Sequence, residues 1–157
     1  MALAGIEDTR TVAASPLDQT VPDVVRLSLD PAGARRDGIN GGWWPHRTDA
    51  GLELPGLIAE VNSRAGRVSR VALPVSAFSN IPHELAIGGR TVRIAWFRYM
   101  NVHTVLLTMA SHDDLVLLVI PPEASPSAAA EGLRLAAAGT PGVRPEAMLA
   151  AAGIATN

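Results

Sequence analysis

The chain has 157 residues and a net charge of −2 at pH 7, with 48% hydrophobic and 18% charged residues. Such a length suits one domain that buries about two-thirds of the surface of its unfolded chain. The absence of cysteine excludes disulfides, thiolate metal sites and cysteine nucleophiles. All 13 basic residues are arginine, which we attribute mainly to codon usage because Ala, Gly and Pro are also abundant. The weak net charge gives no general attraction to nucleic acid or to an anionic membrane.

The sequence indicates neither a signal peptide nor a membrane span. Its start, "MALAGIEDTR", reaches Glu7 and Asp8 without a basic cap or a long apolar run. The longest apolar stretch, residues 115–120, has the length of a strand and is too short to cross a bilayer. We therefore expect a soluble, cytoplasmic protein without a membrane partner.

Three segments are expected along the chain. Residues 1–23 mix polar and apolar types and keep no period, so we expect a flexible leader. Residues 24–139 carry strand and helix patterns that indicate a single α+β domain. Residues 140–157 are expected to form a C-terminal short helix or tail.

The domain begins with strand patterns. Val25, Leu27 and Leu29 alternate with polar residues, which predicts a strand with one buried face. After a loop, "INGGWWP" at 39–45 indicates a short strand or bulge interrupted by glycine. The two glycines would let another backbone approach closely.

A helix pattern follows. Apolar residues recur at helical spacing over 54–61, Pro55 suits a first turn, and Gly66 is expected to cap the C-terminal end. Asp49 and Glu53 lie where carboxylates favour the positive end of the helix dipole. The sequence therefore predicts one amphipathic helix of two to three turns.

Strand patterns return after this helix. Residues 67–74 alternate, and the faces are expected to hold Ser69, Val71 and Leu73 on one side and Val68, Arg70 and Ala72 on the other. A hairpin over 84–97 turns at Gly88 and Gly89, since glycine supplies the positive φ of a tight turn. A second hairpin spans 103–120. Four consecutive antiparallel strands are the simplest result.

The apolar run at 115–120 does not alternate, so it should be buried on both faces and covered by a helix. A helix is predicted over 125–139, with a serine cap, Pro126 in its first turn and Gly139 at its end. A second, short helix opens at Pro145. The expected fold is α+β: a curved, mostly antiparallel sheet of about six strands, open or partly closed into a barrel, with two or three helices packed on it.

Two adjacent indoles occur in "GGWWP". Neighbouring side chains of an extended segment point to opposite faces, so one of Trp43 and Trp44 should enter the core while the other points outward. We expect the helix at 54–61 or the leader to cover the outward ring. The alternatives are a binding platform or a homodimer contact, because large exposed apolar patches rarely persist without a role.

Trp96 and Phe97 repeat this arrangement in "VRIAWFRY", between Arg93 and Arg98. Aromatic rings with interleaved arginines can stack single-stranded bases on a sheet. We favour one ring in the core and the other under a helix, because no glycine-aromatic RNA-binding signature is present and the net charge is negative. Nucleic acid is therefore a less favoured partner.

No motif for metal binding or catalysis is found. The four histidines occupy positions 46, 83, 103 and 112, which lack the spacing of a metal site. His112 with Asp113 and Asp114 could offer ligands, but such residues in a hairpin turn are more often solvated. "AIGGR" lacks the lysine and the following helix of a phosphate loop, and no nucleophile elbow is present. We expect no cofactor, no metal and no catalytic set.

The blocks "INGGWWPHRTD", "GRVSRVAL", "GGRTVRIAWF" and "LLVIPPEASPSAAAEGL" together resemble an actinobacterial domain-of-unknown-function family, number 5994, from Leu27 to Leu135. The Trp-Trp-Pro block is its most specific part, and the resemblance implies no established activity. Where the family usually has an aspartate this chain has Asn40, which cannot act as a general base and which suits a turn with positive φ. The positions that match the pattern are Gly42, Trp43, Trp44, Pro45, Asp49, Glu53, Pro55, Arg70, Trp96, Phe97, Pro121 and Pro122.

We interpret the chain as a non-catalytic binding or interaction domain that uses a Trp/Arg surface to bind a protein or a small ligand. An arginine on an otherwise apolar strand should pair with a carboxylate, so Arg70 is expected to contact Asp49 or Glu53. The candidate binding residues are Trp43, Trp44, His46, Asp49, Glu53, Arg70, Trp96 and Arg98.

Two alternatives stay open. A small enzyme would need a deep pocket that brings His46, Arg70 and a carboxylate together around Trp44, whereas a flat aromatic face would favour binding. A weak single-stranded nucleic-acid binder would use Trp96, Phe97 and Arg98, and its affinity would fall steeply with salt.

Overall fold

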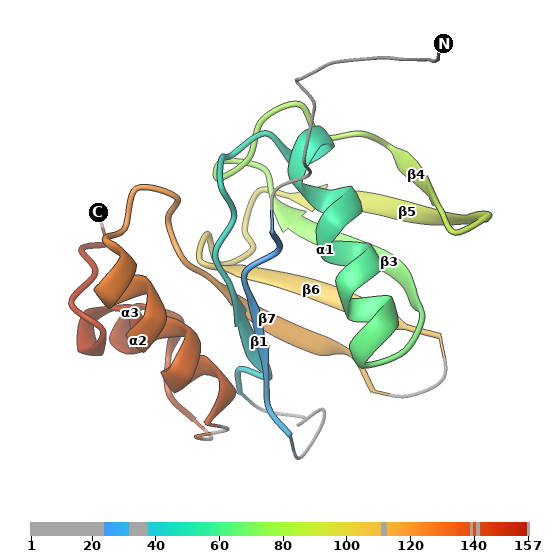
Figure 1. The fold of residues 1–157 in the computed structure, drawn as a ribbon. Coiled ribbons are helices and arrows are strands. Elements are labelled where there is room, and N and C mark those ends of the chain that lie inside the picture. The colour runs from blue at the N-terminus through green and yellow to red at the C-terminus, as the bar shows by residue number, and fades with distance from the viewer. Residues whose placement is uncertain (1–23, 32–37, 111–112, 139, 141, 157) are drawn as a thin grey trace, which may run out of the picture.

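The computed structural model describes residues 24–31, 38–110, 113–138, 140 and 142–156. These residues form one seven-stranded sheet with three helices packed on it (Figure 1). The strands are β1 (Leu27–Leu29), β2 (Gly41–Trp43), β3 (Val68–Pro74), β4 (Glu84–Ile87), β5 (Arg90–Phe97), β6 (Thr104–Met109) and β7 (Leu115–Val119). The helices are α1 (Ala50–Arg64), α2 (Pro126–Ala137) and α3 (Pro145–Ala151).

The strand order is β1-β2-β7-β6-β3-β5-β4. The pairs β2·β7 and β3·β5 are parallel, and the other four pairs are antiparallel. The predicted α+β class with a mostly antiparallel sheet is therefore confirmed. The sheet has seven strands instead of about six, and it is open, with β1 and β4 at its edges, so the barrel alternative is wrong.

Both predicted hairpins form, but their strands are not consecutive in the sheet. Gly88 and Gly89 turn β4 into β5 with φ angles of 58° and 79°. The strand β6 pairs with β7, as expected. However, β3 lies between β6 and β5, so the expected four-stranded meander is wrong. The central position of β3 buries Val71 and Leu73 completely, which an edge position would not do.

The predicted alternation of β3 fails at its start. The register with β6 shifts between Val68 and Arg70, which is the signature of a β-bulge. Val68 therefore joins Val71 and Leu73 in the same buried core, instead of lying on the opposite face. Ser69 is exposed, and its hydroxyl donates to the carbonyl oxygen of Thr108 at 3.0 Å.

The helix α1 begins one turn earlier than its apolar period predicts. Asp49 is the N-cap, and its carboxylate accepts the N–H of Leu52 at 3.0 Å. Pro55 consequently lies inside the helix and not at its start, where it removes one backbone hydrogen bond. The predicted end is confirmed, since Gly66 has a φ of 120° and its N–H donates to the carbonyl of Val61.

Two hydrophobic cores lie on opposite faces of the sheet. The helix α1 covers one face, where Leu54, Leu57 and Ile58 are fully buried. The helices α2 and α3 cover the other face at the β1, β2 and β7 end (Figure 1). Leu117 belongs to the first core and Leu118 to the second, so the predicted burial of this strand on both faces is confirmed.

The C-terminal helices form as predicted. Ser125 caps α2 by accepting the N–H of Ala128, and Pro126 occupies its first turn. In α3 the side chains of Met148 and Leu149 are buried in the second core. Gly139, the predicted end of α2, and the predicted leader at 1–23 lie outside the described residues.

Strand direction gathers several loops at one end of the sheet. Because β2·β7 and β3·β5 are parallel and β6 is antiparallel to both β7 and β3, the four strands β2, β7, β3 and β5 run in the same direction. Their carboxyl ends therefore share one end of the sheet. The chain leaves β2 for α1 on one face and leaves β7 for α2 on the other.

Candidate functional site

The two adjacent tryptophans point to opposite faces, as predicted. Trp43 is 2% exposed and lies in the first core, where its ring stacks on Phe78 with centroids 5.9 Å apart. Trp44 packs against the second core. Of the two expected covers of the outward ring, the helix at 54–61 is wrong, because α1 packs on the face of Trp43, and the leader at 1–23 lies outside the described residues.

The cover of Trp44 comes from the residue before β1 and from the segment after β7. The guanidinium carbon of Arg26 lies 3.5 Å from the centroid of the Trp44 ring. The indole Nε1 of Trp44 donates to the carbonyl oxygen of Pro121 at 3.0 Å. The outward indole is thus a packed and hydrogen-bonded side chain, as buried tryptophans usually are.

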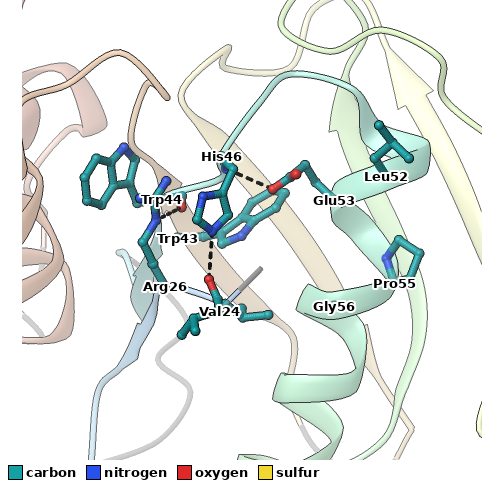
Figure 2. Close-up of a pocket in the computed structure, with 10 residues that line it drawn as sticks. Val24, Arg26, Trp43, Trp44, His46, Leu52, Glu53, Pro55 and Gly56 are labelled. Carbon is teal, nitrogen blue, oxygen red and sulfur yellow. Dashed lines mark hydrogen bonds between the residues drawn. The ribbon is translucent and has the colours of Figure 1, made fainter. Parts of the chain in front are cut away.

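A hollow of about 290 Å³ lies between residues 24–26 and 43–46 on one side and the first turns of α1 on the other (Figure 2). Four of the residues selected from the sequence meet there, namely Trp43, Trp44, His46 and Glu53. We name it the α1 hollow, and its lining consists of Val24, Val25, Arg26, Trp43, Trp44, His46, Leu52, Glu53, Pro55 and Gly56.

The polar groups of the α1 hollow are bonded to each other. The buried carboxylate of Glu53 accepts the backbone N–H of His46 through Oε1 and the Nη1 of Arg47 through Oε2, both at 2.9 Å. The Nε2 of His46 lies 2.8 Å from the carbonyl oxygen of Val24. Since a carbonyl only accepts, Nε2 donates, and a neutral His46 ring carries its lone pair on Nδ1. These contacts fix the segment 44–48 to α1 and to Val24, which precedes β1.

Asp49 and Arg70 lie away from this group. Asp49 caps α1 and accepts the Nδ2 of Asn80 at 3.0 Å. Arg70 is exposed on β3 and lines a different hollow. Its predicted contact with Asp49 or Glu53 is wrong, because within the described part of the chain Arg70 forms no ion pair. The pocket around Trp44 that the small-enzyme alternative requires therefore lacks this arginine.

The second aromatic pair is exposed. Trp96 and Phe97 are 40% and 52% exposed, so the expectation of one ring in the core and one under a helix is wrong. One reason is that β4 pairs only with residues 90–93 of β5 and His83 accepts the N–H of Ile94, so no described strand pairs with the outer edge of residues 95–97. The Trp96 ring instead contacts His83, with centroids 5.1 Å apart. Arg98 and Tyr99 follow, and both are exposed.

A second cavity, of about 330 Å³, lies at the carboxyl ends of the parallel strands. We name it the strand-end cleft. Thr48, Ser76, His103 and Glu123 are its polar residues, and the rest of its lining consists of Pro45, Ala77, Phe78, Val102, Val119, Pro121 and Pro122. The segment that the α1 hollow fixes, residues 44–48, thus forms one wall of this cleft.

The cleft lies where an open sheet typically binds a ligand. In open α/β sheets, ligands bind outside the carboxyl ends of adjacent parallel strands whose connections leave to opposite faces. The strands β2 and β7 are such a pair, because β2 leads to α1 and β7 leads to α2 on the other face. Pro45 follows β2 and Pro121 follows β7, and both line the cleft.

His103 is held in the cleft by its backbone. Its N–H donates to Asn101 Oδ1 at 2.8 Å, and its carbonyl oxygen accepts the N–H of Val119 at 2.7 Å. Among the residues that the structure describes, no hydrogen bond or ion pair engages the His103 imidazole or the Glu123 carboxylate. Both groups are therefore available to a ligand.

Asn101 connects the loop that carries His103 to α3. Its Nδ2 donates to Glu146 Oε2 at 2.9 Å. The pKa of the Glu146 carboxyl is lowered by a hydrogen bond from its own backbone, then by the Asn101 amide, and further by the charges of Arg144 and His103. The C-terminal helix thus fixes the loop that carries His103.

Sequence reasoning missed the cleft. It treated His103 as one of four scattered histidines, and it noted the two prolines after β7 only through the family resemblance. The signal in the sequence that could have indicated the cleft is that polar or proline residues directly follow several of the predicted strands. It could not be used without knowing which strands run in the same direction.

Asn40 has a structural role. Its N–H donates to the Val116 carbonyl, and its Oδ1 accepts the Val116 N–H, both at 2.7 Å, which extends the pairing of β2 with β7. The suggested positive φ is wrong, because Asn80 is the single non-glycine residue with a positive φ among those described. Asn40 lies at the amino end of β2, at the end of the sheet opposite the cleft.

Neither a cluster of metal-ligating side chains nor a membrane-spanning helix is present within the described residues. No group of three or more His, Asp or Glu side chains there could hold a metal ion. His112, one of the residues considered for a metal site, lies outside the described part. None of the helices that the structure describes is long and apolar enough to cross a membrane.

Comparison with known proteins gives one match. The sequence model of a family of unknown function, DUF5994, matches residues 26–136. No curated protein and no solved structure matches the chain. The matched range runs from β1 to the last turn of α2, so it contains both walls of the strand-end cleft.

Proposed function

Because the chain belongs to the DUF5994 family, whose function is unknown, we propose a function from geometry alone: it is a non-catalytic domain that binds a small, mainly apolar molecule in the strand-end cleft. The observation that carries this proposal is the position of the cleft. It lies at the carboxyl ends of β2 and β7, between connections that leave to opposite faces.

The lining supports a small apolar ligand with one polar group. The volume of about 330 Å³ lies at the lower end of the range typical of small-molecule sites. Phe78, Val119 and the prolines offer apolar surface. His103 can accept or donate a hydrogen bond, depending on its tautomer. A hydroxyl or amide group on the ligand would satisfy it.

Binding is favoured over catalysis by how the polar groups lie. Ser76 and His103 both line the cleft, but no hydrogen bond joins them among the described contacts, so a nucleophile and base pair is not assembled. Glu53, the buried carboxylate nearby, is already bonded on both oxygens. The sequence suggested that Trp43 and Trp44 belong to a Trp/Arg binding surface. In this proposal they instead support, together with Arg26, the wall of the cleft that residues 44–48 form.

The test uses N-phenyl-1-naphthylamine, a neutral dye whose fluorescence rises in apolar sites. The wild-type chain should bind it saturably. Ser76→Trp places an indole in the opening and should weaken binding about tenfold or more. Ser63→Trp is the matched control, because Ser63 is exposed near the end of α1, away from the cleft, and it should bind the dye as the wild type does.

Equal dye binding by the Ser76→Trp variant and the wild type would contradict the proposal. Native mass spectrometry of the purified chain gives a second readout. A co-purified small molecule that is present in the wild type and in Ser63→Trp, but absent from Ser76→Trp, would support the cleft as its site.

A further inference from the structure

Two arginines stand side by side on the sheet. Arg70 of β3 and Arg93 of β5 are direct partners in a parallel strand pair, so their backbones are about 4.8 Å apart and their side chains lie on the same face. Both residues are exposed. Neither guanidinium forms a hydrogen bond or an ion pair within the described part of the chain.

Such a pair opposes folding. Like charges placed directly opposite each other on neighbouring strands destabilise a sheet. Glu84, the antiparallel partner of Arg93 on β4, brings one carboxylate to the same face but forms no ion pair among the described residues. His83 is the other titratable group nearby. The two arginines and the one glutamate therefore leave a net positive charge at this point, and nothing in the fold explains it.

The arginines border an open hollow. Residues 70, 83, 84 and 93–95 line a space of about 480 Å³. No described helix covers this face of β3 and β5, because α1 packs on the opposite face and α2 contacts β1, β2 and β7. Next to the arginines, Ala72 and Ala95 are also direct partners. Ala72 is buried, and Ala95, which lines the hollow, has a side chain too small to fill it.

We propose that this face of β3 and β5 is a second site, which binds the phosphate group of a small molecule between the guanidinium groups of Arg70 and Arg93. A guanidinium offers paired donors in a rigid plane, and a phosphate has enough acceptor oxygens for two such forks at once. The bound anion would also offset the repulsion between the two arginines. This site shares no lining residue with the strand-end cleft, so it goes beyond the function proposed above.

The charges favour a single phosphate over a polynucleotide. Glu84 stands beside the pair, and the whole chain has a net charge of −2. Both features oppose the long run of phosphates on a nucleic acid. Glu84 and the net negative charge oppose a single phosphate dianion much less, because two adjacent arginines attract it.

The experiment titrates inorganic phosphate into the ¹⁵N-labelled full chain at low ionic strength, with amide chemical shifts as the readout. Saturable shifts in β3 and β5 are expected. Arg70→Gln and Arg93→Gln should each weaken binding about tenfold or more, as expected for the loss of a charge-assisted hydrogen-bonding group. Glu84→Gln should strengthen binding several-fold, which a purely structural role of the arginines would not produce.

Arg90→Gln is the matched control. Arg90 lies on the same strand and is exposed, but it is three residues from Arg93 and so faces the opposite side of the sheet. When the titration is repeated in about 0.1 M salt, where charges about 10 Å apart are largely screened, it should bind phosphate within about twofold of the wild type. The Arg70→Gln and Arg93→Gln variants should be no less stable than the wild type without phosphate, because each removes a like-charge contact.

Three results would overturn the proposal. The first is phosphate binding by Arg70→Gln and Arg93→Gln that equals that of the wild type. The second is equal weakening by Arg90→Gln, which would indicate a general charge effect. The third is far tighter binding of a short single-stranded oligothymidylate that is lost in Phe97→Ala, which would make the ligand a polynucleotide. If Ser76→Trp leaves phosphate binding intact while it abolishes dye binding, the two sites are independent.

Discussion

The guanidinium of Arg26 lies over the indole of Trp44, 3.5 Å from the ring centroid, while its Nε and Nη2 donate to the carbonyl oxygens of Trp44 and Pro45 at 3.0 and 3.1 Å. One side chain just before β1 therefore covers the outward tryptophan and binds the backbone of Trp44 and Pro45. Because that backbone forms one wall of the strand-end cleft, Arg26 links the edge strand to the candidate site.

Removal of this side chain should destabilise the fold. Arg26→Ala loses the cation–π contact and two hydrogen bonds, so we expect a loss of about 2 kcal/mol in the free energy of unfolding, measured by urea denaturation. Arg26→Lys keeps a charge near the ring but loses the paired donors, so it should cost less. A loss in Arg26→Ala no larger than that of an exposed arginine such as Arg90→Ala would show that the contact adds nothing.

Glu53 should matter through its hydrogen bonds more than through its charge. Glu53→Ala leaves the His46 N–H without its acceptor and should cost about 2 kcal/mol in the free energy of unfolding. Glu53→Gln keeps an amide oxygen for that N–H and loses an ion pair to Arg47, whose side chain is 46% exposed. It should cost less than about 1 kcal/mol. Equal losses of unfolding free energy in the two variants would contradict the prediction that the hydrogen bond contributes more than the charge.

The two glycines of β2 should differ in their tolerance of a side chain. A Cβ at Gly41 would lie 2.2 Å from the carbonyl oxygen of Ser28, which is backbone and cannot move without breaking the pairing of β1 with β2. Gly41→Ala should therefore cost about 3 kcal/mol or more. A Cβ at Gly42 would meet side chains of α2, the nearest at 3.0 Å. Gly42→Ala should lower the melting temperature less, and the opposite order would contradict this reading.

Glu146 should contribute to stability at neutral pH and lose that contribution in acid. Its pKa is lowered from the ordinary value of 4.5, first by its own backbone hydrogen bond and then by Asn101. A carboxyl whose pKa is lowered on folding stabilises the fold above the unfolded pKa and loses this effect as the pH falls through the folded pKa. The difference in stability between the wild type and Glu146→Gln should therefore shrink as the pH drops below 4.5.

Thermal unfolding from pH 7 to pH 3 measures this difference. Asn101→Ala removes the second of the two hydrogen bonds, so it should bring the acid-dependent loss closer to that of the Glu146→Gln variant. A pH profile of Glu146→Gln that runs parallel to the wild type down to pH 3 would contradict the assignment.

Much of the local structure could be predicted because it depends on neighbours in the sequence. The turn at Gly88 and Gly89, the cap at Ser125 and the opposite faces of Trp43 and Trp44 each follow from the backbone preference or side-chain direction of a few residues. The buried run at 115–120 also predicted a strand between two layers. These features do not require a knowledge of which strands are partners.

The tertiary structure alone decided the pairing of strands and therefore the candidate sites. Strands pair through backbone groups that every residue carries, so the sequence of β3 does not reveal that β5 lies parallel beside it. That choice depends on which arrangement buries the most apolar surface over the whole chain. It placed Arg70 next to Arg93 instead of Asp49 or Glu53, and it left Trp96 and Phe97 exposed. It also brought the ends of β2, β3 and β7 together around His103, which no spacing in the sequence indicates.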